Sequence, residues 1–142
     1  MLSHADNINP LGPPSWDDFI GQHDIKSRLD VMIEAAGMLD QPLSHILLLA
    51  PPGTGKTSLA ALIAQRIDLP FYKLTMPLQM PMQFFTLVEE AQEGIVFLDE
   101  VHNAPNKFQE MLQTALYEGV AHAPGWHIPV GHLTFMAATT WE

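Results

Sequence analysis

A glycine-rich stretch at residues 50–58, A-P-P-G-T-G-K-T-S, carries the strongest chemical signal in the 142-residue sequence. It fits the pattern of a small residue, four variable positions and then Gly-Lys-Ser/Thr, which Gly55, Lys56 and Thr57 complete. Gly53 and Gly55 permit backbone angles that turn several N–H groups toward one anion. The helix expected next adds its positive end. The pattern therefore predicts a cradle for phosphate groups.

The side chains of this loop predict the rest of a nucleotide site. Lys56 is expected to reach the β and γ phosphates of a bound nucleotide, and the Thr57 hydroxyl is expected to hold Mg²⁺. The predicted nucleotide contacts of the loop are Pro52, Gly53, Thr54, Gly55, Lys56, Thr57 and Ser58.

A second chemical signal is the acidic pair Asp99 and Glu100, which follows the apolar run I-V-F-L. An aspartate at such a strand end can hold Mg²⁺, and a glutamate directly after it can polarise an attacking water. A strand that simply ends in solvent would show the same letters, but the phosphate loop upstream favours the functional interpretation. Thr57 and Asp99 are the predicted magnesium ligands, and Glu100 is the predicted catalytic carboxylate.

The histidines offer no predicted metal site. His102 follows the acidic pair, but Mg²⁺ prefers oxygen ligands, so we expect His102 to pack or to link neighbouring groups. His122, His127 and His132 recur every five residues around an expected hairpin. We interpret this repeat as coincidence.

The composition disfavours a DNA-binding, membrane-spanning or disulfide-bonded protein. Six Lys and Arg residues stand against sixteen Asp and Glu residues, giving a net charge of −10. A chain this acidic should not grip DNA by itself, because affinity for DNA comes largely from neutralised phosphates. There are no cysteines, no apolar run of membrane-spanning length and no signal-peptide pattern at the start. These features predict a cytoplasmic protein without disulfides.

The expected elements alternate between helix and strand. Helical spacing of apolar residues predicts helices at 22–40, 58–67, 83–92 and 107–118, and short apolar runs predict strands at 44–50, 70–74, 94–100 and 133–138. A turn is expected at 123–125. Short, solidly apolar strands suit a parallel sheet covered on both faces, so we predict a three-layer α/β/α fold with a mainly parallel sheet.

With both motifs in place, the chain resembles the AAA+ ATPases and, among them, the RuvB family of Holliday-junction branch-migration motors. The likeness covers roughly residues 15–140 through S-W-D-D-F-I-G-Q, the phosphate loop, G-I-V-F-L-D-E-V-H and F-M-A-A-T-T. It implies that Phe19 and Ile20 contact the adenine base. It also implies that Thr140 is the sensor of the γ-phosphate, with Thr139 as the less favoured candidate. Ala50 stands where the family usually has glycine.

The resemblance also implies that a complete AAA+ module has elements that residues 1–142 do not contain. We expect residues 1–14 to be a flexible lead-in and residues 15–142 to be a nucleotide-binding core truncated after sensor 1. The last strand, the helical lid and the arginine finger would be missing, and neither Arg28 nor Arg66 resembles a finger. We therefore expect nucleotide binding with weak hydrolysis or none, and an open sheet edge beside residues 45–50.

Two segments depart from the family or stay ambiguous. The stretch 120–132 stands where the RuvB family has a long hairpin that docks the partner RuvA; its shortness here puts that partnership in doubt. The methionine-rich link at 75–85 falls where ring ATPases often carry a pore loop, although methionines more often fill a core.

The leading hypothesis is the Mg·ATP-binding core of a RuvB-like ATPase that remodels or translocates DNA in recombination or replication. We expect it to form a homo-oligomeric ring when complete and to engage DNA only through that assembly. The alternative is a nucleotide-dependent switch that binds a protein partner without efficient turnover. A GTPase is disfavoured because N-K-F-Q at 106–109 lacks the carboxylate that would recognise guanine, and a small-molecule kinase because no arginine-rich lid is present.

Overall fold

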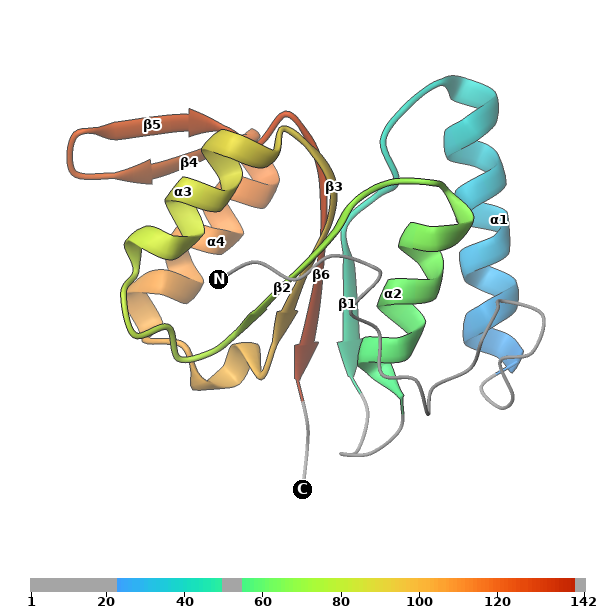
Figure 1. Ribbon diagram of the computed structural model, residues 1–142, viewed down its shortest axis with the longest axis horizontal. Coiled ribbons are helices and arrows are strands. Elements are labelled where there is room, and N and C mark those ends of the chain that lie inside the picture. The colour runs from blue at the N-terminus through green and yellow to red at the C-terminus, as the bar shows by residue number, and fades with distance from the viewer. Residues whose placement is uncertain (1–22, 50–54, 140–142) are drawn as a thin grey trace.

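The computed structural model describes residues 23–49 and 55–139. Within them, four parallel strands form one sheet in the order β1-β6-β3-β2. The strands are β1 (Ile46–Leu49), β2 (Phe71–Thr75), β3 (Glu93–Asp99) and β6 (His132–Thr139). The helices are α1 (His23–Leu39), α2 (Lys56–Arg66), α3 (Met82–Ala91) and α4 (Asn106–Glu118). Figure 1 shows α1 and α2 on one side of the sheet and α3 and α4 on the other, which confirms the predicted three-layer fold.

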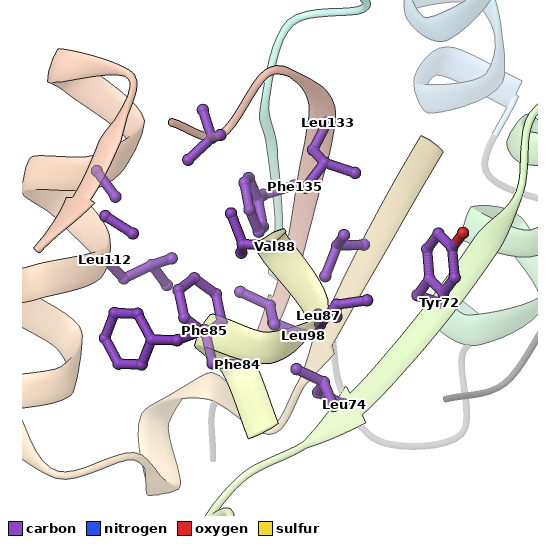
Figure 2. Close-up of a cluster of buried hydrophobic side chains, with 14 of the residues drawn as sticks. Tyr72, Leu74, Phe84, Phe85, Leu87, Val88, Leu98, Leu112, Leu133 and Phe135 are labelled. Carbon is purple, nitrogen blue, oxygen red and sulfur yellow. The ribbon is translucent and has the colours of Figure 1, made fainter. Parts of the chain in front are cut away.

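The sheet has a separate hydrophobic core on each face, because successive strand residues point to opposite sides. On β3, Ile95 and Phe97 pack with α1 and α2, whereas Val96 and Leu98 pack with α3 and α4. All four side chains are fully buried. Figure 2 shows the second core, where aromatic and aliphatic side chains of α3 fill the space above the strands. Burial on both faces explains why this strand is a continuous apolar run.

Strand β1 lies at an edge of the described sheet. It pairs only with β6 among the described strands, and the side chain of Leu47 is 65% exposed. Among the described strands, β1 therefore lies at the edge of the sheet, which is the position where we predict an open edge.

A small antiparallel hairpin forms beyond α4. It consists of β4 (Val120–Ala123) and β5 (Trp126–Pro129), joined by the predicted Pro124-Gly125 turn. Gly125 adopts a positive φ of 79°, which only glycine takes without strain. Ala121 and Ile128 tie the hairpin into the core of α3 and α4.

The predicted elements are present with small shifts at their ends. Strand β3 ends at Asp99, one residue before the predicted end, because Glu100 has a left-handed φ of 54° and caps a short 3₁₀ helix, η2 (Val101–Asn103). Leu39, included in the apolar periodicity of the first helix, is 65% exposed.

The methionine-rich link divides between core and surface. Met76 is buried among the side chains of the α3–α4 core, as the packing interpretation predicts, whereas Met80 is 64% exposed. Among the described helices, none is long and apolar enough to cross a membrane.

Candidate nucleotide-binding site

The start of α2 faces the carboxyl ends of the sheet strands. Gly55 precedes the helix with a left-handed φ of 83°, a conformation that accounts for glycine at this position of the loop. Lys56 is the first helical residue, and its Nζ donates a hydrogen bond of 3.3 Å to the Thr139 carbonyl at the end of β6. The half-buried Thr57 and Ser58 follow in the first turn. Lys56 thus joins the phosphate loop to the middle of the sheet.

Asp99 ends β3 on the face of the sheet that α2 covers. This follows from strand alternation, because Ile95 and Phe97 pack in the same core as α2. Asp99 Oδ1 accepts a 2.9 Å hydrogen bond from the Glu100 backbone N–H, and Asp99 Oδ2 lies 3.9 Å from Lys73 Nζ. One predicted magnesium ligand, Asp99, is therefore held at the end of β3 by contacts with Glu100 and Lys73.

Glu100 is connected to the end of β6 through His102. His102 Nε2 lies 3.1 Å from Glu100 Oε2, and His102 Nδ1 lies 2.8 Å from the Thr139 hydroxyl. A carboxylate can only accept, so Nε2 must carry the hydrogen in this contact. In a neutral His102, Nδ1 then accepts from the Thr139 hydroxyl. His102 thus links Glu100 to Thr139, in agreement with the linking role expected of it.

These contacts form one continuous chain at the carboxyl edge of the sheet. It runs from Lys56 through the backbone carbonyl and hydroxyl of Thr139 to His102 and Glu100. These contacts join a cation, a hydroxyl and a carboxylate, and Asp99 ends the strand β3 at the same edge of the sheet. Open parallel sheets bind ligands at this edge.

Several predicted site residues lie outside the described residues. They are Phe19, Ile20, Pro52, Gly53, Thr54 and Thr140. Their proposed contacts with base, phosphate and γ-phosphate therefore remain predictions. No group of three or more His, Cys, Asp and Glu side chains is arranged to hold a metal in residues 23–49 and 55–139. The predicted magnesium site instead combines one hydroxyl with one carboxylate.

Sequence reasoning missed Lys73 as a neighbour of Asp99. Parallel pairing of β2 with β3 sets Thr75 opposite Asp99 and Lys73 opposite Phe97. Lys73 and Asp99 therefore share a face near the same strand end. The alternation within residues 71–75 predicts which face of the strand Lys73 lies on. It does not predict that Asp99 is its neighbour, because the register between two strands cannot be read from either strand alone.

A groove lies on the opposite face of the sheet, beside the open edge. It has a volume of about 410 Å³, and its walls come from β1, β6, η2 and α4. His45 lines it, and partial burial lowers the pKa of the His45 imidazole from its ordinary value of 6.5. His45 Nδ1 accepts a 3.0 Å hydrogen bond from the backbone N–H of Phe135. The neutral imidazole is therefore part of the attachment of β1 to β6.

Known proteins similar to this chain are RuvB proteins. The Holliday junction branch migration complex subunit RuvB of Ligilactobacillus salivarius is 33% identical over 144 residues, covering 94% of this chain and 43% of that protein. The solved structure of the Thermotoga maritima RuvB Holliday junction branch migration motor has a TM-score of 0.75 at 32% identity, covering 89% of this chain and 41% of that one. This chain thus spans less than half the length of these relatives. The profile of the Holliday junction DNA helicase RuvB P-loop domain matches residues 11–141, and the chain belongs to that family.

Proposed function

We propose that this chain is the Mg·ATP-binding core of a RuvB-like AAA+ ATPase. The observation that carries the proposal is the unbroken set of contacts from Lys56 through Thr139 and His102 to Glu100. It connects the residue expected on the phosphates with the residue expected on the attacking water. Membership of the RuvB P-loop family supports the same assignment.

The proposed roles follow the chemistry of phosphoryl transfer. Lys56 neutralises the β and γ phosphates, and the backbone N–H groups of residues 53–58 bind phosphate oxygens. The Thr57 hydroxyl and the Asp99 carboxylate hold Mg²⁺ through hard oxygen ligands, the type that this ion prefers. Phe19 and Ile20 contact the base.

Glu100 orients the water that attacks the γ-phosphate, and Thr140 senses the presence of that phosphate. Glu100 Oε2 contacts His102 Nε2. When nucleotide binds, Glu100 either keeps this contact or replaces His102 with a water molecule as its partner. Because His102 also contacts Thr139, a shift at the end of β6 can change the position of Glu100.

Full activity belongs to a larger assembly in this proposal. The sequence contains two arginines, and Arg66 forms an ion pair with Asp30 between α2 and α1. An arginine supplied to the γ-phosphate is worth roughly 10³–10⁵ in rate in related systems. We propose that further chain and a neighbouring subunit in a homo-oligomeric ring provide it, and that this ring engages DNA in recombination or replication.

A nucleotide-dependent switch on a protein partner is the second candidate. It is favoured by the contact between Glu100 Oε2 and His102, because that oxygen would have to leave His102 before it could accept a proton from water. The two candidates predict the same binding of nucleotide and differ in turnover.

Single-turnover hydrolysis of ATP with the protein in excess separates them. The ATPase proposal predicts slow, Mg²⁺-dependent release of phosphate that Glu100→Gln abolishes while nucleotide binding persists. Glu110→Gln is the matched control, because Glu110 is an exposed carboxylate on α4. Binding without phosphate release in wild type, Glu100→Gln and Glu110→Gln alike would support the switch. Absence of binding would contradict both candidates.

A further inference from the structure

The β4–β5 hairpin sets two imidazole rings face to edge on its surface. Cross-strand pairing places His122 directly opposite His127, with the two Nδ1 atoms 2.8 Å apart. The ring centroids are 4.9 Å apart and the ring planes meet at 77°. Both side chains are exposed. In the sequence we interpreted the five-residue spacing of these histidines as coincidence. In the structure His122 and His127 are in direct contact, because the Pro124-Gly125 turn folds one strand back on the other.

The second nitrogen of His122 faces a carboxylate. His122 Nε2 lies 3.5 Å from Glu118 Oε1 at the end of α4. The carboxylate accepts, so Nε2 carries the hydrogen and a neutral His122 presents its Nδ1 lone pair toward His127. His127 then donates from its own Nδ1, and transfer of that hydrogen to Nε2 would free a second lone pair. Each of the two nitrogens, which lie 2.8 Å apart, would then present a lone pair.

The separation of the two nitrogens matches the geometry of a metal ion. With metal–nitrogen bonds of about 2.0 Å, two adjacent ligands of a square-planar ion lie roughly 2.8 Å apart, and two ligands of a tetrahedral ion lie roughly 3.3 Å apart. The observed 2.8 Å agrees with the square-planar value. Imidazole suits late first-row ions, and Cu²⁺ binds such donors most strongly in the divalent series.

Glu118 supplies the outer contact typical of metal-binding histidines. A ligating imidazole almost always donates its other N–H to a carboxylate, a carbonyl or water, which fixes the tautomer and the ring orientation. Here the Glu118 carboxylate would accept from His122 Nε2, and His122 Nδ1 would bind the metal. Gly119 ends α4 with a left-handed φ of 78°, which turns the chain from the helix into β4 and keeps Glu118 beside the hairpin.

We propose that the hairpin binds one divalent late transition-metal ion, Cu²⁺ most strongly, through Nδ1 of His122 and Nδ1 of His127. Glu118 is a positioning residue that orients His122. Water, or a donor atom from another molecule, completes the coordination. The hairpin extends at the outer end of α3 and α4, whereas the nucleotide-site residues lie at the carboxyl edge of the parallel sheet (Figure 1). The metal site is therefore separate from the nucleotide site.

Calorimetric titration of the full chain with CuCl₂, NiCl₂ and ZnCl₂ in a non-coordinating buffer tests the proposal. We expect one saturable site per chain, with Cu²⁺ tighter than Ni²⁺ and Zn²⁺. Electron paramagnetic resonance of the copper complex should show two coordinated nitrogens. His122→Ala and His127→Ala should each remove the saturable site, and Glu118→Gln should weaken it by about tenfold.

His132→Ala and His4→Ala are the matched controls and should leave the titration unchanged. His132 continues the five-residue repeat on the sheet strand β6, and His4 reports binding near the amino terminus. Metal-free melting temperatures show whether each variant is folded. Binding that survives in both His122→Ala and His127→Ala, or a wild-type chain that takes up no Cu²⁺, would overturn the proposal.

Discussion

At the scale of single residues, His102 connects groups whose roles were inferred separately. It contacts Glu100 through one ring nitrogen and the Thr139 hydroxyl through the other. Neither contact requires a charged imidazole. A movement of the end of β6 would therefore move Glu100 through the His102 side chain.

We predict that His102→Gln slows ATP hydrolysis by up to about 100-fold, because small displacements of a water-orienting group have effects of that size. Nucleotide affinity should be unchanged, since the side-chain partners of His102 are Glu100 and Thr139, and neither is the favoured phosphate contact. Single-turnover rates and equilibrium binding measured on the same protein check the two parts. His132→Gln, an exposed histidine on β6, is the control. Loss of affinity with an unchanged rate would contradict the positioning role.

His45 predicts a pH dependence of folding stability. Burial lowers its pKa in the folded state below the ordinary 6.5, so the unfolded chain binds the proton more readily. The free energy of unfolding should therefore fall as the pH drops below about 6.5 and level off below the folded pKa. Its Nδ1 must also remain unprotonated to accept from the Phe135 N–H.

The test is chemical denaturation at pH 7.5 and pH 5.5. His45→Asn preserves an acceptor at a similar distance from the backbone but cannot titrate, so the variant should lose less stability between the two pH values than the wild type. His132→Asn should behave like the wild type. Equal losses in wild type and His45→Asn would contradict the assignment.

At the scale of elements, β1 is attached to the sheet by more than backbone pairing. The Thr134 side chain is 2% exposed, and its hydroxyl donates to the Leu43 carbonyl just before β1. Together with the His45 contact, it fixes the segment that leads into the phosphate loop. Rigid strands on both sides of a loop help to hold its ligand-binding groups in place.

We predict that Thr134→Val destabilises the fold by about 1–3 kcal/mol, because it leaves a buried carbonyl without a partner while preserving side-chain shape. Thr114→Val is the control: the Thr114 hydroxyl donates to the Glu110 carbonyl at an exposed site on α4, where water can replace it. That variant should change stability by no more than about 0.5 kcal/mol. Urea denaturation gives both values, and equal effects would contradict the anchoring role.

The elements also show what sequence patterns could and could not predict. The continuous apolar runs of β1 and β3 predicted parallel strands covered on both faces, and β3 is buried in this way, whereas Leu47 of β1 is exposed. The contact between His122 and His127, and the contact between Lys73 and Asp99, depend on register between strands. Register is set by tertiary packing and turn geometry, which the spacing of residues in one segment does not specify.

At the scale of the whole molecule, the sheet presents two different boundaries. Its carboxyl edge carries Lys56, Asp99 and Glu100, whereas its β1 side exposes Leu47 and the apolar groove. The two regions meet at η2 and the end of β6, because His102 and Thr139 also line the groove.

If the loop before α2 binds nucleotide through Lys56, nucleotide should raise the stability of the whole folded chain. A ligand that binds only the folded state, present at about 100 times its dissociation constant, stabilises by about 2.7 kcal/mol. For a chain of this size the melting temperature should rise by roughly 5–10 °C. Lys107→Ala, on the exposed surface of α4, is the matched control for Lys56→Ala.

The direct measurement is the melting temperature with and without Mg·ATP for wild type, Lys56→Ala and Lys107→Ala. Our account predicts an increase in wild type and in Lys107→Ala, and none in Lys56→Ala. The same increase in Lys56→Ala as in wild type, or no increase in any of the three proteins, would contradict the nucleotide site.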